Sequence, residues 1–313
     1  ARYVKKRPAV ICFENSFHGR TIFTLGLTSK IEPYKFGFGP FPSEIYRTHY
    51  AYCYRCSFGL TYPTCDITCA DYLEDIFTSH VAPESTAAVI AEPIQGEGGF
   101  ITPPPEYFPK LQKITQKYDI ALIVDEVQTG VGRTGKYFAI EHWSVEPDLI
   151  TSAKSLAGGM PLSAIIGRKE MLNKIHVGGL GGTFSGNPIS CRAGLAVLGI
   201  LFEDGLLKKG KNLGEKILFR FKEFQKKYEI VGDVRGKGPM LAIELVRDRE
   251  TKEPAKDEAD KLVKLCYDKG LVLLSCGTFG NVIRTLMPLV ITDEQLERGL
   301  ATLEDCLYEV DHG

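Results

Sequence analysis

The chain carries almost no net charge and contains no long apolar run. Its 38 lysine and arginine residues balance 39 aspartate and glutamate residues, which argues against a protein that binds nucleic acid or a charged membrane surface. No apolar stretch approaches the length of a membrane-spanning helix, no signal peptide opens the chain, and internal repeats are absent. The sequence therefore predicts a cytoplasmic protein with neither a nucleic-acid nor a membrane partner.

Cysteine, by contrast, is frequent, with nine residues in the chain. Four of them follow one another closely as Cys53-x2-Cys56-x8-Cys65-x3-Cys69. Such spacing permits a zinc or iron–sulfur site, but no histidine or acidic second shell supports one. Disulfides of the kind found in thermophile cytoplasm are a second alternative. We favour the third, free thiols in a loop, and predict no metal ligands.

Several apolar runs without polar alternation predict a buried parallel sheet. Such runs are typical of strands covered on both faces, and they occupy residues 87–93, 120–126, 148–154 and 162–167. Between the first two runs, Leu111, Ile114 and Tyr118 recur at helical spacing, and a strand–helix–strand order favours parallel pairing. We therefore expect an α/β fold, with a mostly parallel central sheet and helices on both faces.

The last hundred residues predict a smaller α+β unit. Short strands are expected at residues 241–245 and 282–286, and Thr292 with Gln295 forms a capping box for a final helix. We place the domain boundary at residue 205, which gives a large domain over 1–205 and a small domain over 206–313. The chain opens as though inside a βαβ unit, so we expect an N-terminal part of the large domain to precede it.

Charged side chains end three of the predicted strands, namely Glu92, Asp125 and Lys154. In open α/β sheets the ligand lies at the carboxyl ends of the strands. A desolvated lysine is a nucleophile that forms a Schiff base with an aldehyde. Pyridoxal phosphate is such an aldehyde, and it also needs a carboxylate that keeps its pyridine nitrogen protonated. From the local residues alone, Lys154 is balanced between this role and that of a surface lysine in a turn.

The segment ALIVDEVQTGVGRTGKYFAIEHWSVEPDLITSAKSLAGGMPL, residues 121–162, resembles the core of the class III (subgroup II) aminotransferases. These enzymes belong to the fold-type I pyridoxal-phosphate family. Further family segments occur in the same order at residues 17–21, 92–100, 181–188 and 281–300. The resemblance covers essentially the whole chain and implies a fold-type I transferase with pyridoxal 5'-phosphate as its cofactor.

By this resemblance, five residues contact the reactive part of the cofactor. Lys154 forms the Schiff base and then moves the proton between the substrate's Cα and the cofactor, while Asp125 pairs with the pyridine nitrogen. Gln128 hydrogen-bonds the 3′ oxygen of the ring. Val127 packs on one face of the ring and Phe17 stacks on the other, which aligns the ring and excludes water.

The resemblance also implies a homodimer with shared active sites. The cofactor's phosphate needs clustered backbone N–H donors, and in the family most of them come from a Gly-Ser/Thr motif upstream of the segment that matches residues 17–21. No such motif precedes that segment here, which agrees with the expected N-terminal part. Thr183 is the remaining phosphate ligand, in a loop that reaches into the neighbouring subunit, although its segment also fits a Gly-rich turn. His18 is balanced between a site role and a packing role.

Two arginines and a glutamate indicate how substrates bind. Arg20 and Arg284 match the carboxylate-binding positions of the family, and a planar guanidinium can donate two parallel hydrogen bonds to a carboxylate. Arg284 lies in an apolar strand and needs a partner charge when buried, for which Glu97 is the family's residue. Glu97 would neutralise Arg284 while an ω-amine is bound and move aside for glutamate or 2-oxoglutarate, with Arg20 on the distal carboxylate. Glu92 matches a motif position near this site and has either a site role or a loop-supporting one.

The sequence thus predicts a transaminase of the 4-aminobutyrate branch. It would convert 4-aminobutyrate to succinate semialdehyde and 2-oxoglutarate to glutamate by a ping-pong mechanism. The choice of branch rests on residues 177–188, 233–245 and 276–289. The alternatives are an acetylornithine or ornithine aminotransferase and an amino-acid racemase on the same scaffold. An alternative of another class is a truncated, non-catalytic homologue that serves as an interaction subunit.

Overall fold

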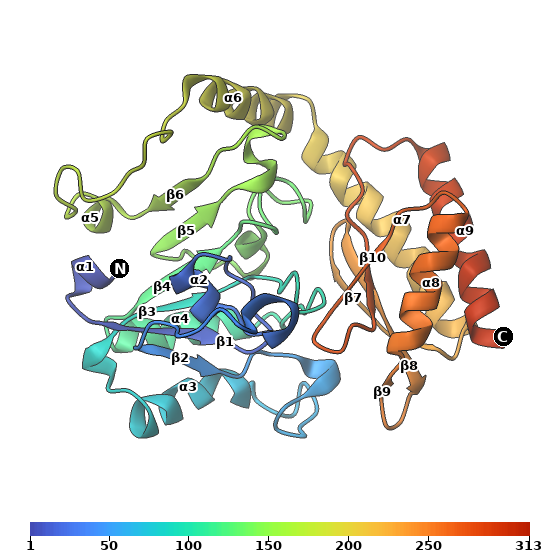
Figure 1. Cartoon of the computed structure of the whole chain (residues 1–313), viewed down its shortest axis with the longest axis horizontal. Helices are drawn as coiled ribbons and strands as arrows, with labels where there is room; N and C mark the ends of the chain where they lie inside the picture. Colours follow the sequence, from blue (N-terminus) through green and yellow to red (C-terminus); the bar gives the residue numbers. More distant parts are fainter. The chain divides into compact units, whose positions relative to one another are not determined.

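The computed structural model describes residues 1–313, which form two compact units (Figure 1). Unit 1 consists of Ala1–Pro93, Pro103–Val131 and Phe138–Asp204, and unit 2 of Ile94–Thr102, Gly132–Tyr137 and Gly205–Gly313. The division into domains at residue 205 stays a prediction, and unit 2 additionally includes two short segments from the first half of the chain. No helix in either unit is long and apolar enough to span a bilayer.

A six-stranded sheet in the order β2-β1-β3-β4-β5-β6 forms the centre of unit 1. Its strands are β1 (Ala9–Phe13), β2 (Ile45–Thr48), β3 (Thr86–Ala91), β4 (Ala121–Asp125), β5 (Leu149–Ser152) and β6 (Ala164–Gly167). The first five are parallel, whereas β6 pairs antiparallel with β5. The mostly parallel sheet predicted from the apolar runs is therefore confirmed. Every residue of β1 and β3 is buried, as expected for strands covered on both faces.

Helices and short helical turns precede, connect and follow these strands. The helices are α1 (Arg2–Lys5), α2 (Ile22–Leu27), α3 (Thr68–Ser79), α4 (Tyr107–Lys117), α5 (Lys169–Leu172) and α6 (Pro188–Glu203). The turns are η1 (Ile31–Lys35), η2 (Cys53–Arg55), η3 (Pro83–Ser85), η4 (Ala139–Trp143) and η5 (Lys154–Ala157). Helix α4 buries Leu111 and Ile114, as their spacing predicted. Because it connects the parallel neighbours β3 and β4, the expected strand–helix–strand unit is present.

Two long helices, α6 and α7 (Leu206–Lys227), follow one another and are separated by a turn at Gly205. Helix α6 ends at Glu203, and α7 begins directly after Gly205. The φ of Gly205 is 68°, a left-handed conformation that glycine adopts without a steric penalty. The chain therefore turns here, and this is also where it passes from unit 1 to unit 2.

Unit 2 is built on an antiparallel sheet in the order β10-β11-β8-β7, with β9 paired to β8. Its strands are β7 (Val231–Lys237), β8 (Met240–Asp248), β9 (Glu253–Pro254), β10 (Leu274–Cys276) and β11 (Val282–Arg284), and its helices are α7, α8 (Lys256–Asp268) and α9 (Asp293–His312). Val234, Ile243 and Ile283, which are neighbours across three strands, join the helices in one apolar core. The predicted capping box of α9 is confirmed, since Gln295 N donates to Thr292 Oγ1 and Thr292 N to Gln295 Oε1.

Candidate active site

Asp125 stands at the carboxyl end of the central strand β4, where it is 7% exposed. Its Oδ1 accepts hydrogen bonds from Val127 N at 3.1 Å and from Thr151 Oγ1 at 3.0 Å. Its Oδ2 lies 2.8 Å from Nδ1 of His18. Two segments that are distant in sequence, those of His18 and Thr151, therefore converge on this carboxylate together with the neighbouring Val127. The contribution of Thr151 was not predicted, although its position on the neighbouring strand β5 could have indicated it.

His18 and Asp125 form a buried ion pair. The His18 side chain is 1% exposed. Burial disfavours its charged form, but the hydrogen bond and the charge of Asp125 outweigh this and raise the pKa of His18. Burial likewise disfavours the charged form of Asp125, yet His18, Val127 and Thr151 together lower the pKa of Asp125. His18 therefore contacts the carboxylate of the candidate site directly, and its role there stays a prediction.

Glu126 is a buried carboxyl that the sequence analysis did not single out, although it directly follows Asp125 at the end of β4. It accepts hydrogen bonds from Thr129 Oγ1 and from the backbone N–H groups of Ala139 and Ile140. Burial raises its pKa to about 7 despite these three donors. Glu126 thereby fixes the turn in which Val127 and Gln128 lie, both of them half-buried.

Glu92 supports the loop that carries Phe17. Its Oε1 accepts a hydrogen bond from Phe17 N at 2.8 Å, and the residue is 5% exposed. The hydroxyl of buried Tyr50 donates to the backbone oxygens of Glu92 and Pro93. Of the two roles left open for Glu92, the contacts in unit 1 therefore favour the supporting one. Phe17 itself packs edge-to-face against Tyr34, with 4.9 Å between ring centroids.

Lys154 follows β5 and begins the turn η5. Its φ is 46°, and the residue is exposed. Of the two alternatives that the local residues left open, the single chain shows Lys154 as an exposed lysine in a turn, and its part in the site stays a prediction. The physical reason for the exposure is local, because the left-handed backbone turns the chain out of the sheet, and the buried positions of the turn are Leu156 and Ala157.

Arg20 lies in the loop before α2 and is exposed. Its guanidinium carbon lies 4.7 Å from the ring centre of Tyr34 and 6.0 Å from that of Phe17. A guanidinium over an aromatic face is held by attraction to the ring while its N–H groups stay available at the edge. Tyr34 was not predicted as part of this group, because nothing in its local sequence distinguishes it.

In unit 2, Arg284 pairs with Glu97. Arg284 Nη1 lies 2.6 Å from Glu97 Oε1. The Arg284 side chain is 9% exposed and that of Glu97 23%. The buried arginine thus has the carboxylate that the sequence analysis assigned to it, and that carboxylate keeps some access to solvent.

Thr183 and the cysteine cluster complete the predicted set in unit 1. Thr183 is exposed in the loop between α5 and α6, where the side chain of neighbouring Phe184 is 85% exposed.

All nine cysteines carry free thiols. The four clustered ones, Cys53, Cys56, Cys65 and Cys69, line one small cavity of about 20 Å³. No group of three or more potential ligands is arranged to hold a metal ion.

The donors around Asp125 fit the ring of pyridoxal phosphate. A carboxylate has about four acceptor positions, and Val127, Thr151 and His18 occupy three of them. The lowered pKa of Asp125 keeps it ionised, so it can accept a further hydrogen bond from a protonated pyridine nitrogen. The arrangement therefore suits a flat, positively charged ring nitrogen at the carboxyl end of β4.

Comparison with known proteins gives the same assignment. The family model for the class-III aminotransferases matches residues 1–307. A probable 4-aminobutyrate aminotransferase of Bacillus subtilis is 45% identical over 304 residues, which are 97% of this chain and 70% of that protein. A 5-aminovalerate aminotransferase of Pseudomonas aeruginosa is 45% identical over 310 residues, covering 99% of this chain and 71% of the relative.

Solved structures agree with the sequence matches. A taurine:2-oxoglutarate aminotransferase of Bifidobacterium kashiwanohense, in complex with pyridoxal phosphate and glutamate, superposes with a TM-score of 0.91 at 29% identity. The superposition covers the whole of this chain and 72% of that protein. An amine transaminase of an uncultivated Pseudomonas species, also in a pyridoxal-phosphate-bound form, has a TM-score of 0.92 at 28% identity over 99% of this chain and 72% of its own. The chain therefore belongs to the class-III aminotransferases, which depend on pyridoxal phosphate.

Proposed function

We propose that this aminotransferase transfers the amino group of 4-aminobutyrate to 2-oxoglutarate, giving succinate semialdehyde and glutamate in two successive half-reactions. The observation that carries the proposal is the ion pair of Arg284 with Glu97. A removable carboxylate on a buried arginine suits an enzyme whose two substrates differ by one carboxylate at the amino carbon. Relatives named for 4-aminobutyrate and 5-aminovalerate support an ω-amino acid as the donor.

We assign the chemical steps to residues of unit 1. When bound, pyridoxal phosphate supplies an aldehyde for the amino group and a protonated ring that takes up electron density from the substrate's Cα. The amine of Lys154 would hold the cofactor at its aldehyde carbon and would carry the proton to and from the substrate's Cα. Asp125 holds the proton on the pyridine nitrogen, and His18 keeps Asp125 ionised.

The remaining cofactor contacts position the ring. Phe17 and Val127 are assigned to its two faces and Gln128 to its 3′ oxygen. Their support comes from the bonds described above, since Glu92 holds Phe17 N and Asp125 holds Val127 N. These residues would hold the ring in one orientation relative to Lys154, and such positioning of reacting groups contributes to rate.

Substrate choice is assigned to Arg20, Arg284 and Glu97. With 4-aminobutyrate, Glu97 stays on Arg284, and Arg20 binds the single carboxylate of the substrate. With glutamate or 2-oxoglutarate, the α-carboxylate replaces Glu97 on Arg284 in a bidentate pair, and Arg20 binds the distal carboxylate. The replacement exchanges one carboxylate for another, so the buried guanidinium keeps a counter-charge in both half-reactions.

We propose further that the active form is a homodimer, with Thr183 serving the partner subunit's phosphate site. Support comes from apolar side chains exposed on β6, on the loop around Thr183 and on α6, namely Ile165, Ile166, Val177, Leu180, Phe184, Ile189 and Leu195. Exposed apolar surface of this extent is typical of an interface. Sedimentation should give a dimer for the wild type and a monomer for Leu195→Glu. Phe219→Glu on α7, a site of similar exposure, should remain dimeric.

Amino-donor profiling with 2-oxoglutarate as acceptor tests the assignment of substrate. Preferred turnover of 4-aminobutyrate supports the proposal, whereas preference for acetylornithine or ornithine would replace it with that specificity. Racemisation of an amino acid without any oxo-acid acceptor would identify the racemase alternative. A folded dimer that takes up no cofactor would identify the non-catalytic one.

A further inference from the structure

The loop that carries Glu97 is held at both ends and in its middle. Gln95 and Ile101 form an isolated antiparallel bridge, with N–H···O distances of 3.0 and 3.2 Å in the two directions. Within the loop, the backbone oxygen of Glu97 accepts a hydrogen bond from Gly277 N at 3.0 Å. The backbone oxygen of Gly99 accepts one from Arg235 Nε at 2.8 Å. Two anchors of unit 2 therefore fix the backbone on either side of residue 98.

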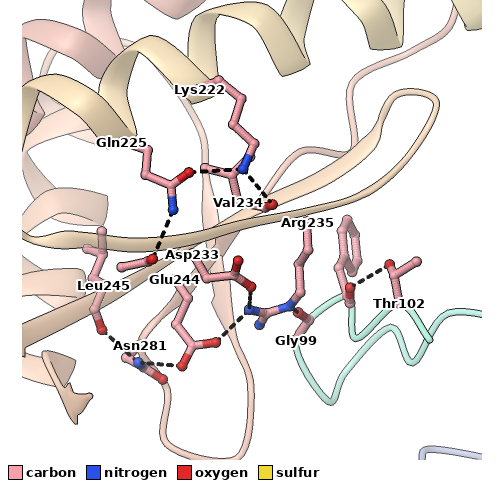
Figure 2. A network of polar contacts seen from close by, with 12 residues as sticks. Gly99, Thr102, Lys222, Gln225, Asp233, Val234, Arg235, Glu244, Leu245 and Asn281 are labelled. Atoms are coloured by element: carbon pink, nitrogen blue, oxygen red, sulfur yellow. Dashed lines mark hydrogen bonds and ion pairs between the residues drawn. The ribbon is translucent and has the colours of Figure 1, made fainter. Parts of the chain in front are cut away.

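Arg235 is itself rigidly held (Figure 2). Its Nη1 lies 2.6 Å from Glu244 Oε2 and 2.8 Å from Asp233 Oδ2. The side chain of Arg235 is 9% exposed, and that of Glu244 is fully buried. Asn281 Nδ2 donates to the backbone oxygen of Leu245 and, at 3.4 Å, to Glu244 Oε1. A guanidinium fixed by two carboxylates in this way presents its remaining Nε–H in one direction.

The register of the sheet aligns Arg235 with Arg284. Arg235 on β7 and Arg284 on β11 are both paired with Ala242 on the strand between them, β8. Directly opposed residues of antiparallel strands point to the same face, so both arginines project from one face, about 10 Å apart across two strand spacings. The opposite face, with Val234, Ile243 and Ile283, is the apolar core. The loop thus contacts one arginine through Gly99 and the other through Glu97.

Glycine is required where the loop meets Arg235. A Cβ on Gly99 would lie 3.1 Å from Arg235 Nη2 and 3.2 Å from Val282 Cγ2, and the φ of Gly99 is 116°. The loop backbone therefore contacts the face of the sheet directly, and a side chain at this point would lift it.

We infer that Arg235 is a positioning residue. It fixes the backbone of the loop at residues 95–101 so that the Glu97 carboxylate stays within ion-pair distance of the Arg284 guanidinium. This deepens and rests on the proposed function, because the pairing of Glu97 with Arg284 is what admits a donor without an α-carboxylate. Arg235 touches neither substrate nor cofactor in this role. It sets the preference between ω-amino donors and glutamate by anchoring Gly99 while the Glu97 side chain leaves and returns.

Arg235→Lys is the sharpest test. Lysine keeps a positive charge for Glu244. Its single ammonium group, however, lacks the planar set of N–H donors with which arginine bonds both carboxylates and Gly99 O at the same time. Single-turnover rates should fall about tenfold or more with 4-aminobutyrate and much less with glutamate, since misplacing a positioning group is costly. In a Glu97→Ala background the same substitution should leave the ratio of the two rates unchanged. Equal losses with both donors, or a further change in ratio in that background, would overturn the inference.

Two further variants and a measurement other than activity separate the positioning role of Arg235 from a general loss of folding and from the choice of substrate. Gly99→Ala leaves Arg235 and Glu244 intact and should change the donor ratio in the same direction. Arg249→Lys is the matched control, because Arg249 also donates to backbone oxygens of unit 2, but to those of Gln225, Tyr228 and Glu229. Arg249→Lys should change neither the ratio of the two single-turnover rates nor the hydrogen exchange of the loop at residues 95–101.

Hydrogen exchange of a peptide covering residues 95–101 should accelerate in Arg235→Lys and not in Arg249→Lys. Unchanged exchange overturns the inference whatever the activities are. If exchange accelerates but the wild type uses no ω-amine, the positioning role stands and the proposed function fails.

Discussion

Glu97 and Arg284 form an ion pair 2.6 Å long between residues 187 positions apart in the sequence. The two side chains differ in exposure, with the arginine nearly buried and the glutamate partly accessible. Removing the partner of a buried charge is costly, whereas exchanging it for another carboxylate is not. The pair is therefore suited to open only when a substrate brings a carboxylate of its own.

Glu97→Ala should separate the two half-reactions. The single-turnover rate with 4-aminobutyrate is expected to fall roughly ten- to a hundredfold, because Arg284 then lacks a counter-charge. The rate with glutamate should change little, since the α-carboxylate of glutamate supplies that charge. Stopped-flow absorbance of the cofactor measures both rates. Glu229→Ala, at an exposed acidic residue of unit 2, is the control, and equal losses in Glu97→Ala would reject the exchange of carboxylates.

Lys154→Ala should abolish turnover while leaving the protein folded. Lys154 is exposed, so its truncation should cost little stability, yet loss of both the Schiff-base amine and the proton carrier should lower kcat at least about 10³-fold. Borohydride reduction followed by peptide mapping should find a phosphopyridoxyl group on Lys154 in the wild type and in the control Lys169→Ala. An adduct on another lysine, or normal turnover of Lys154→Ala, would refute the assignment.

His18→Asn should remove a pH dependence of stability from unit 1. The raised pKa of His18 means that its stabilisation is fully present below its usual value of 6.5 and is lost as pH rises through the folded-state pKa. The lowered pKa of Asp125 means that its stabilisation is present above its usual 3.8 and is lost in stronger acid. Asparagine keeps a donor for Asp125 without the charge.

The advantage of the wild type over His18→Asn should therefore be largest between about pH 4 and pH 6.5 and shrink in alkali. Urea unfolding followed by the fluorescence of Trp143, the single tryptophan of the chain and a buried residue of unit 1, measures this. A difference that stays constant from pH 6 to pH 9 would show that His18 is not charged in the folded protein.

The sequence predicted those strands and helix ends that depend on residues close to one another in the chain. The apolar runs identified β3 and β4, and the spacing of Thr292 and Gln295 identified the start of α9. Asp125 could be singled out because it ends an apolar strand. These features depend on residues within one turn or one strand of each other.

The remaining features depend on contacts between distant segments. Nothing near Arg235 in the sequence indicates that its Nε–H meets Gly99, 136 positions away. Tyr34 under Arg20 and the donors to Glu126 are of the same kind. For Lys154 the local sequence left two alternatives open, and its exposure follows from one left-handed residue that turns the chain away from its apolar neighbours.

Two helical glycines of unit 2 should respond oppositely to alanine. A Cβ on Gly214 in α7 would lie 2.2 Å from the carbonyl carbon of Gly238. A backbone atom cannot move to relieve such an overlap as the end of a flexible side chain can. Gly214→Ala should therefore destabilise unit 2 by about 2 kcal/mol or more, as overpacking a tight contact does.

Gly299 in α9 is the matched control. Its Cβ would meet only Leu271 Cδ1, at an ordinary contact distance of 3.6 Å. Gly299→Ala should stabilise the unit by about 0.5–1 kcal/mol, because alanine loses less backbone entropy than glycine on forming a helix. Urea unfolding monitored by far-ultraviolet circular dichroism compares both variants with the wild type. Similar shifts for the two would mean that α7 does not approach the β7–β8 turn as closely as the Gly214–Gly238 contact requires.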